Sequence, residues 1–288
     1  MNICEDSFTI DSSLKPFHLF TKHFYLQKNN IKKHIFIVHG AVEYHKRYNE
    51  FISYLLGGSS EPIAISCYDH IGHGHSGGAK CYVESFSNYE DDLISFISES
   101  IKKLKTDDCE KIIVAHSLGG LIVLKTFLTR LEVKSIVIDR FIFSSPCIKP
   151  INYIPRYFVK KVDKIKNQIG FIRLKNLVTG KDLTHCNDKA MEFDNDIHIH
   201  KFITLRMGLE ILKASEEIMP LSYFWNKPSL FLIAGDDKLV DPKATELFCK
   251  GATNKYVTTK IYTHAKHELL NETCRNEVFS CIMGYIEN

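Results

Sequence analysis

No part of the 288-residue sequence has the long apolar run that a membrane-spanning helix needs, which is roughly 18 residues. The most apolar stretch, residues 112–128, is interrupted by polar side chains and by two glycines. The first residues, MNICEDS, are acidic and lack the basic and apolar regions of a signal peptide. We therefore expect a cytoplasmic chain that does not cross a membrane, with at most peripheral membrane contact.

Cysteine occurs nine times, an odd number, and no two cysteines form a C-x-x-C pair. This pattern predicts neither a disulfide framework nor a zinc ribbon, and it is typical of a reduced intracellular protein. A strong excess of one charge sign is also missing, because 37 Lys and Arg face 34 Asp and Glu. We therefore expect no nucleic-acid partner. Hydrophobic residues at 44% and charged residues at 25% are ordinary for a globular chain.

Short apolar runs alternate with longer amphipathic ones along most of the chain, as in an α/β fold. The short runs are almost wholly apolar, which indicates strands buried on both faces of a parallel sheet. We expect a mostly parallel central sheet flanked by helices, opened by an edge strand near residues 20–27. The other predicted strands are residues 35–39, 62–66, 111–115, 141–144, 229–234 and 255–262. Helical apolar spacing predicts helices over residues 89–104, 118–130, 242–249 and 271–286.

One stretch breaks this alternation. Between residues 148 and 221 there is no convincing buried strand, only amphipathic sequence with helical spacing. A helical insertion between two strands of such a sheet usually forms a lid over the carboxyl ends of the strands. We therefore predict one core, residues 1–147 and 222–288, with a helical cap, residues 148–221, inserted in it.

The strand that ends at Ala115 runs directly into His116-Ser117-Leu118-Gly119 and then into an apolar helix. This strand–turn–helix context is the one in which G-x-S-x-G presents a nucleophilic serine. The turn is so tight that the residues two before and two after the serine must be small. Ala115 and Gly119 satisfy that requirement, so Ser117 is the candidate nucleophile.

A serine hydroxyl needs a base to take its proton, and in this chain order an acid and then a histidine should follow. Asp236, Asp237 and Asp241 all follow a predicted strand and compete for the role of the acid, although Asp241 precedes a proline and suits a helix N-cap better. His264 and His267 both follow the last predicted strand. From the spacing alone, these alternatives stay open.

The negative oxygen of an acyl-transfer intermediate needs backbone N–H donors aimed at it. One donor should be the residue after the nucleophile, Leu118. The other should come from the loop after the early strand, which ends in Val-His-Gly40-Ala41. Glycine there lets the backbone approach the substrate, so Ala41 is the expected second donor.

Five segments together carry a resemblance to a known family. Residues 39–48, HGAVEYHKRY, resemble the HGxxEHxxRY segment of the monoacylglycerol lipase and lysophospholipase family of α/β hydrolases. Residues 69–78, DHIGHGHSGG, resemble its DxxGHGxSxG loop, and residues 115–119, AHSLG, resemble its GHSMG elbow. Residues 235–241 and 267–272 are similar to its acid and histidine segments. The resemblance runs from about residue 30 to the end and implies an α/β-hydrolase fold with a cap.

The resemblance implies Ser117 as nucleophile, His267 as general base and Asp237 as the acid that orients the histidine. It also implies Ala41 and Leu118 as the oxyanion donors.

Glu43 and Arg47 match residues that lie, in the family, near the polar end of the pocket, where the glycerol head is held. Three positions depart from the family pattern: Ala115 replaces a glycine, and Tyr44 and Leu270 stand where histidines are found. The first departure should leave the elbow intact, whereas the other two weaken the inference about the head group.

The family implies a serine hydrolase that cleaves the carboxylic ester of a single-chain lipid, most simply monoacylglycerol to fatty acid and glycerol. Alternatives with the same chemistry are a lysophospholipase and a short-chain carboxylesterase. An aminopeptidase would need an acidic cluster for an α-ammonium group, and the sequence does not clearly place one. A non-catalytic lipid-binding protein usually lacks a triad member, and here all three are present. The oligomeric state is left open.

No metal or organic cofactor is implied by these motifs. The spacing of His70, His73 and His75 could suggest zinc. The family has this loop without metal, so we expect none. His198 and His200 have no acid or cysteine at ligand spacing.

The predicted cap is strongly basic over residues 149–181, which contain nine Lys or Arg and a single acid, Asp163. Within it, Lys160, Lys161 and Lys164 are interleaved with apolar side chains. One interpretation is a solvated helix face. The other is a cap that rests on an anionic membrane and takes up lipid there.

Overall fold

The computed structural model of the chain describes residues 3–151, 165–175 and 178–288. Within these residues, eight strands form one twisted sheet in the order β1-β2-β4-β3-β5-β6-β9-β10. The strands are β1 (Cys4–Asp11), β2 (His18–Tyr25), β3 (Lys33–Val38), β4 (Ile63–Tyr68), β5 (Glu110–His116), β6 (Arg140–Ser144), β9 (Ser229–Ala234) and β10 (Val257–Tyr262). Only β2 is antiparallel to its neighbours, β1 and β4, and the remaining pairs are parallel. The mostly parallel sheet expected from the apolar runs is confirmed.

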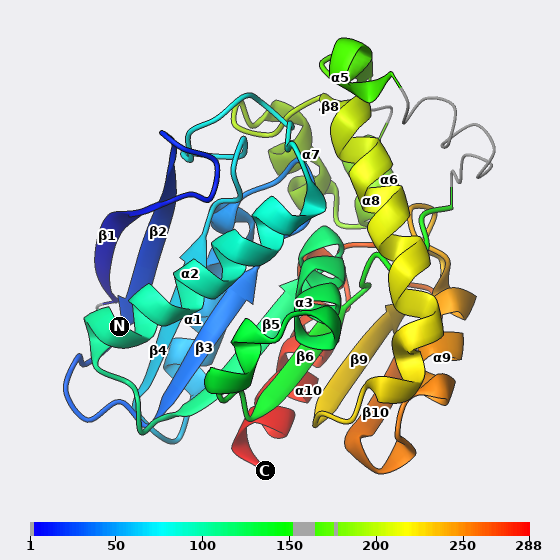
Figure 1. Cartoon of the computed structure of the whole chain (residues 1–288). Helices are drawn as coiled ribbons and strands as arrows, with labels where there is room; N and C mark the ends of the chain where they lie inside the picture. The colour runs from blue at the N-terminus through cyan, green and yellow to red at the C-terminus, as the bar shows by residue number, and fades with distance from the viewer. Residues whose placement is uncertain (1–2, 152–164, 176–177) are drawn as a thin grey trace.

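Helices cover both faces of the sheet (Figure 1). The two faces have separate hydrophobic cores, because strands β3 to β9 bury alternate side chains on opposite sides. The first core is completed by α2 (Phe86–Leu104), α3 (Leu118–Thr129) and α9 (Pro242–Gly251), and the second by α1 (Asn49–Gly58) and α10 (Arg275–Glu287). Short 3-10 helices link several elements: η1 (His45–Tyr48), η2 (Glu132–Ser135), η3 (Met219–Phe224), η4 (Asn254–Tyr256) and η5 (Leu269–Asn271).

Two elements of the core differ from the prediction. The edge strand expected near residues 20–27 is β2, but β1 pairs outside it and takes the edge of the sheet. Only Ile10 of β1 is buried, so this strand carries almost no hydrophobic signal. Helix α1 was not predicted either.

The segment predicted as a cap contains α5 (Lys166–Ile169), α6 (Gly180–Leu183), α7 (Asn187–Asn195) and α8 (Leu205–Ile218) in its described part. Helix α8 crosses in front of the sheet and packs on α3 (Figure 1). The segment is not purely helical as expected, because β7 (Arg173–Lys175) and β8 (Phe202–Thr204) form a short antiparallel pair. Three-residue strands so far apart in sequence leave no periodic signal. The division at residues 148 and 221 stays a prediction.

The lysines that suggested membrane contact, Lys160, Lys161 and Lys164, lie outside the described residues. In the part of the chain that the structure describes, none of the helices combines the length and the apolar character needed to span a bilayer.

The register of the parallel strands determines which loops meet at the carboxyl edge of the sheet. Val38 of β3 pairs with Ala115 of β5, so the loop after β3 and the turn after β5 leave the sheet side by side. Ala234 of β9 pairs with Tyr262 of β10, so the loops that follow these two strands are also neighbours. All the candidate catalytic residues are on these four loops.

Candidate active site

Ser117 is at the tight turn between β5 and α3 and has a backbone conformation that non-glycine residues rarely adopt. Its φ is 49° and its ψ is −116°, which costs on the order of 1–3 kcal/mol. The surroundings hold this conformation, since the Ser117 N–H donates to the Ser144 carbonyl at 3.1 Å and the Cys147 N–H donates to the Ser117 carbonyl at 2.9 Å. The hydroxyl therefore lies at the amino end of α3.

Gly119 explains why the turn can be so tight. A Cβ at this position would lie 2.2 Å from the Val38 carbonyl oxygen and 2.6 Å from that of His39, which no side chain tolerates. The first turn of α3 therefore packs directly against the backbone of the loop after β3. Ala115 is fully buried in β5, and its methyl group is accommodated there.

The structure brings Ser117, His267 and Asp237 together in one hydrogen-bonded chain. The His267 Nδ1–H donates to Asp237 Oδ2 at 2.6 Å, which leaves Nε2 free to accept the Ser117 hydroxyl proton at 2.9 Å. The other Asp237 oxygen accepts the N–H groups of Leu239 and Val240 at 2.8 and 3.1 Å, which fixes the carboxylate in place. The imidazole thus lies between a hydroxyl and a held carboxylate, as general-base activation of a serine requires.

The competing candidates lie elsewhere. Asp236 and His264 are exposed, whereas Asp237 and His267 are buried. Asp241 is the N-cap of α9, where its side chain accepts the Lys243 N–H at 3.0 Å. The expectation that Asp241 suits a helix cap is confirmed.

The electrostatics of the site favour a proton on His267. Burial by itself would lower the pKa of His267, but the charge and hydrogen bond of Asp237 outweigh it and raise the pKa above 6.5. His116 lies beside it with a ring centroid 4.8 Å away. Burial and the nearby His267 lower the pKa of His116 to about 4, so this second ring stays neutral. A single imidazole near Ser117 can therefore exchange protons near neutral pH.

The expected oxyanion donors lie on the two elements that Gly119 brings into contact. Leu118 is the first residue of α3, so its N–H precedes the first intrahelical hydrogen bond. Ala41 follows Gly40 in the turn after β3 and lines the same pocket as Ser117.

Glu43 lines the pocket beside Glu268, and its carboxylate also holds the turn after β3 that carries Ala41. Its Oε1 accepts the Gly40 N–H at 2.6 Å and the Tyr48 hydroxyl at 2.7 Å. Burial, followed by the neighbouring carboxylate of Glu268, raises the pKa of Glu43 to about 7.

Arg47 is buried, but it does not itself line the pocket, because its guanidinium is committed to neighbouring groups. It forms a salt bridge with Glu268 and approaches Glu192 of α7 at 3.7 Å. Burial would raise the pKa of Glu268, but the charge of Arg47 prevails and lowers it. One positive charge thus faces the two pocket carboxylates, Glu43 and Glu268.

Three pocket residues were missed by the sequence reasoning. Glu268 directly follows His267, and that adjacency was the one available signal. His116 lies within the elbow motif, where it was treated only as a spacer. Cys147 lines the pocket from the loop after β6, and burial, followed by the charge of Asp237, raises the pKa of its thiol to about 12. The sequence also suggested no acidic cluster at the site, whereas the structure places Glu43 and Glu268 in its wall.

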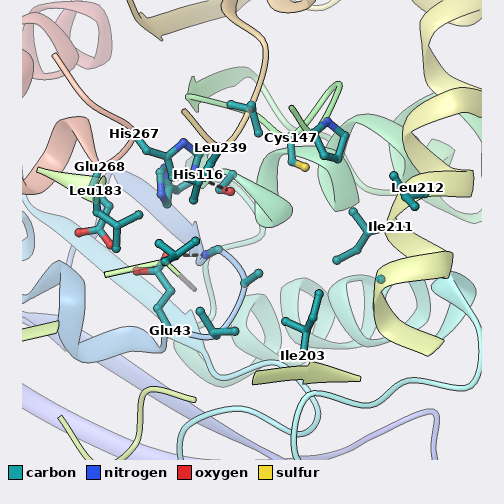
Figure 2. A pocket seen from close by; sticks show the side chains of 18 of the residues that line it. Glu43, His116, Cys147, Leu183, Ile203, Ile211, Leu212, Leu239, His267 and Glu268 are labelled. Atoms are coloured by element: carbon teal, nitrogen blue, oxygen red, sulfur yellow. Dashed lines mark hydrogen bonds between the residues drawn. The ribbon is translucent and has the colours of Figure 1, made fainter. Parts of the chain in front are cut away.

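The pocket around Ser117 has a volume of about 280 Å³ and two chemically different ends. Figure 2 shows Glu43, Glu268 and His267 on one side and Ile203, Ile211 on the other. The apolar end is built by the α8 residues and by side chains from the β7–β8 pair. Among the described residues, the apolar side chains in the wall are Ala41, Val42, Pro150, Leu174, Val178, Leu183, Phe193, Ile203, Leu205, Leu209, Ile211, Leu212, Leu239 and Val240.

Two of the three histidines whose spacing resembled a zinc motif, His70 and His73, form hydrogen bonds with the backbone through their rings. His70 Nε2 bonds to the His39 carbonyl at 2.8 Å, and His73 Nδ1 bonds to the Ile71 carbonyl at 3.0 Å. Among the residues that the structure describes, no three His, Cys, Asp or Glu side chains gather as a metal site.

A family model described as serine aminopeptidase, S33, matches residues 29–274, which include every candidate site residue. The chain belongs to this family. As an S33 protein with an α/β-hydrolase fold, it is a serine hydrolase, and the family resemblance drawn from its motifs is confirmed.

Several known proteins resemble this S33 hydrolase over most of its length. The phospholipase YtpA of Bacillus subtilis is 28% identical over 258 residues, covering 88% of this chain and 94% of YtpA. The monoglyceride lipase of Homo sapiens is 25% identical over 243 residues, covering 83% of this chain and 76% of the lipase. A soluble variant of the Saccharomyces cerevisiae monoglyceride lipase, solved with a substrate analog, superposes with a TM-score of 0.83. It is 17% identical, with 100% of this chain and 96% of that chain covered, and the superposition shows the shared fold.

Proposed function

We propose that this hydrolase cleaves the carboxylic ester of a single-chain lipid and that its substrate is monoacylglycerol, released as fatty acid and glycerol. One observation carries the proposal: the Ser117–His267–Asp237 chain opens into a pocket that is apolar at one end and polar at the other. A monoacylglycerol has the same division, with a long acyl chain on one side of the ester and a small polyol on the other. The monoglyceride lipases among its relatives support the same substrate.

In the first half of the proposed reaction, Ser117 Oγ attacks the ester carbonyl while His267 Nε2 takes its proton. Asp237 holds the imidazole in the correct tautomer and stabilises the imidazolium. The N–H groups of Ala41 and Leu118 receive the negative oxygen of the tetrahedral intermediate. His267 then returns the proton to the leaving glycerol oxygen, and the acyl group remains on Ser117.

In the second half, a water molecule gives its proton to His267 and attacks the acyl-serine carbonyl. The same two backbone donors stabilise the second tetrahedral intermediate. Collapse of that intermediate returns the proton to Ser117 and releases the fatty acid.

The charges at the polar end support glycerol over a phosphate-bearing head group. None of the described residues that line the pocket is a lysine or an arginine. A phosphate drawn into this end would therefore meet Glu43 and Glu268, whereas glycerol hydroxyls can donate hydrogen bonds to them. The apolar end suits the acyl chain, since burying ten methylenes contributes up to about 8 kcal/mol at roughly 0.8 kcal/mol each.

The proposal is tested by fatty-acid release from a long-chain 1-monoacylglycerol and from a matched lysophosphatidylcholine, with wild type and Ser117→Ala compared. We expect fast release from the glyceride, slower release from the lysophospholipid, and loss of both in the variant. A preference for the lysophospholipid would leave the proposed serine mechanism in place but refute monoacylglycerol as the substrate. Release that does not depend on Ser117 would refute the proposed nucleophile.

Two further substrates complete the assay. A short-chain ester that is hydrolysed faster than the glyceride would identify a general carboxylesterase. An aminoacyl p-nitroanilide tests the reading in which Glu43 and Glu268 hold an α-ammonium group. If no substrate is cleaved but lipid still binds, the chain is a non-catalytic lipid-binding protein.

We also propose that the cap makes peripheral contact with anionic membrane. Phe171 and Ile172, beside β7, expose 60% and 51% of their surface, and the neighbouring Arg173 and Lys175 are exposed as well. Apolar side chains flanked by cations are the combination that binds an anionic lipid surface. Leu174, between the two cations, lines the pocket, so lipid leaving the membrane at this point would be close to the apolar end.

A further inference from the structure

Helix α8 forms one wall of the apolar end of the pocket. Its residues Leu205, Leu209 and Leu212 face the cavity at helical spacing, together with Ile211. Gly208 lies in the middle of this face and lines the cavity without contributing a side chain. The wall of the pocket therefore has a notch in it, one residue wide.

Neither the backbone nor the packing requires glycine at this position. Gly208 is inside a regular α-helix, where glycine is a poor helix former and alanine a good one. Among the atoms of the described residues, a Cβ placed on it would meet one within 4 Å, the Ile203 Cδ1 at 3.6 Å, which is an ordinary van der Waals contact. This contrasts with Gly119, where the same atom would collide with two carbonyl oxygens.

The direction in which a side chain at residue 208 would point shows which part of the pocket the glycine leaves open. Ile203 of β8 is itself a pocket-lining residue and faces α8 across the apolar end (Figure 2). Because the Cβ of residue 208 would point towards Ile203, a longer side chain would extend into the cavity between α8 and β8. The missing side chain thus leaves space at the end of the pocket away from Glu43 and Glu268.

We propose that Gly208 determines the acyl-chain length that the enzyme accepts: its missing side chain leaves the space that the distal part of a long acyl chain occupies. The inference rests on the proposed function for the direction of the acyl chain. It goes beyond that function by assigning specificity to one position on the cap segment.

The test is a graded series, Gly208→Ala and Gly208→Leu, assayed on p-nitrophenyl butanoate, octanoate and palmitate. Each methylene that loses its apolar contact weakens binding about fourfold. We expect the ratio of palmitate to butanoate kcat/KM to fall about fourfold in the alanine variant and about 15-fold or more in the leucine variant. A ratio equal to that of wild type in the folded variants would overturn the inference.

Gly284 supplies the matched control. It lies in the exposed part of α10, and a Cβ there would meet no atom of the part of the chain that the structure describes within 4 Å. Gly284→Ala and Gly284→Leu should stabilise their helix as the substitutions at Gly208 do, while leaving the palmitate-to-butanoate ratio unchanged. A ratio that fell equally in both series would show that the effect belongs to helix stability and not to the pocket.

Binding without chemistry separates this inference from the proposed function. In a Ser117→Ala background, the affinity for the fluorescent fatty acid cis-parinaric acid should fall about 15-fold when Gly208→Leu is added. If hydrolysis proves independent of Ser117 but this affinity falls, the proposed function fails and the role of Gly208 stands. If the affinity does not change, the role of Gly208 fails, whatever the enzyme hydrolyses.

Circular dichroism of each variant establishes that it is folded. If the leucine variant does not fold, the alanine variant, whose side chain fits without conflict, decides the outcome.

Discussion

Glu43 offers a direct test of the electrostatics at the polar end. Its pKa is raised from the ordinary 4.5 to about 7 by burial and by the neighbouring Glu268. A shift of this size corresponds to about 3 kcal/mol of differential stability between the two protonation states. Because the folded-state pKa is the higher one, this stabilisation is complete below pH 4.5 and is lost as the pH rises through 7.

Replacing Glu43 by glutamine removes the titration and leaves the shape of the side chain. We therefore expect the unfolding free energy of Glu43→Gln, relative to wild type, to increase by up to about 3 kcal/mol between about pH 5 and about pH 8. Urea unfolding at each pH measures this difference. Glu99→Gln, the same substitution at an exposed position of α2, is the matched control. A difference at Glu43 that stays constant with pH would refute the buried, charge-coupled carboxylate.

The activities of Glu43→Gln and Glu43→Ala then distinguish a role of Glu43 in positioning the loop after β3 from a role of its charge. Glutamine retains an oxygen that can accept the Gly40 N–H and the Tyr48 hydroxyl, so Glu43→Gln should keep most of its kcat. Glu43→Ala leaves both donors without their acceptor and releases the loop that carries the Ala41 amide. Losing one oxyanion donor costs about 10²- to 10³-fold in rate, so we expect kcat to fall towards that range. A variant in which only KM rises would instead assign Glu43 to head-group binding alone.

Three further predictions concern the reaction, the thiol and the cap. Since Asp237 raises the pKa of His267, kcat/KM should fall as the pH drops through a value above 6.5. Asp237→Asn should move the midpoint of this pH profile to lower pH and reduce kcat about 10⁴-fold. A pH profile unchanged by the substitution would contradict the pairing of Asp237 with His267. Because burial raises the pKa of the Cys147 thiol to about 12, little of it is thiolate at neutral pH, and iodoacetamide should inactivate the enzyme slowly. Fast inactivation that Cys147→Ala prevents would show that the thiolate is reactive instead. Sedimentation with phosphatidylserine vesicles should decrease in Phe171→Ser and Arg173→Glu, and unchanged sedimentation in both would argue against the membrane contact.

The candidate triad could be located from the sequence because each of its members follows a strand of the sheet. The strands before Ser117 and Asp237 are buried apolar runs, which give a reliable strand signal. The strand before His267, β10, is mostly exposed and gives a weaker signal, but it ends at the same edge of the sheet. The choice among neighbouring aspartates was harder. It depends on burial and hydrogen bonding in the loop, as in the cap that Asp241 provides to α9.

The parts that the sequence did not predict depend on contacts between distant residues. Arg47 and Glu268 are 221 residues apart in the chain, and nothing local signals that they pair. The sequence does not predict the β7–β8 pair either, because its strands are three residues long and partly exposed. Strand β1 lies at the edge of the sheet and buries only Ile10, with Phe8 partly buried beside it, so the hydrophobic pattern was too short to predict this strand.

The contact between Gly119 and the backbone of Val38 limits how this enzyme can be improved. The two amides expected to hold the oxyanion belong to segments whose main chains touch, and no adjustable side chain lies between them. Random mutagenesis therefore has little scope to refine this part of the site, because almost any change at residue 119 would separate the segments. Selection for faster turnover or new substrates should instead accumulate substitutions in the pocket wall and in the segment predicted as a cap, where a side chain can be exchanged without moving the backbone.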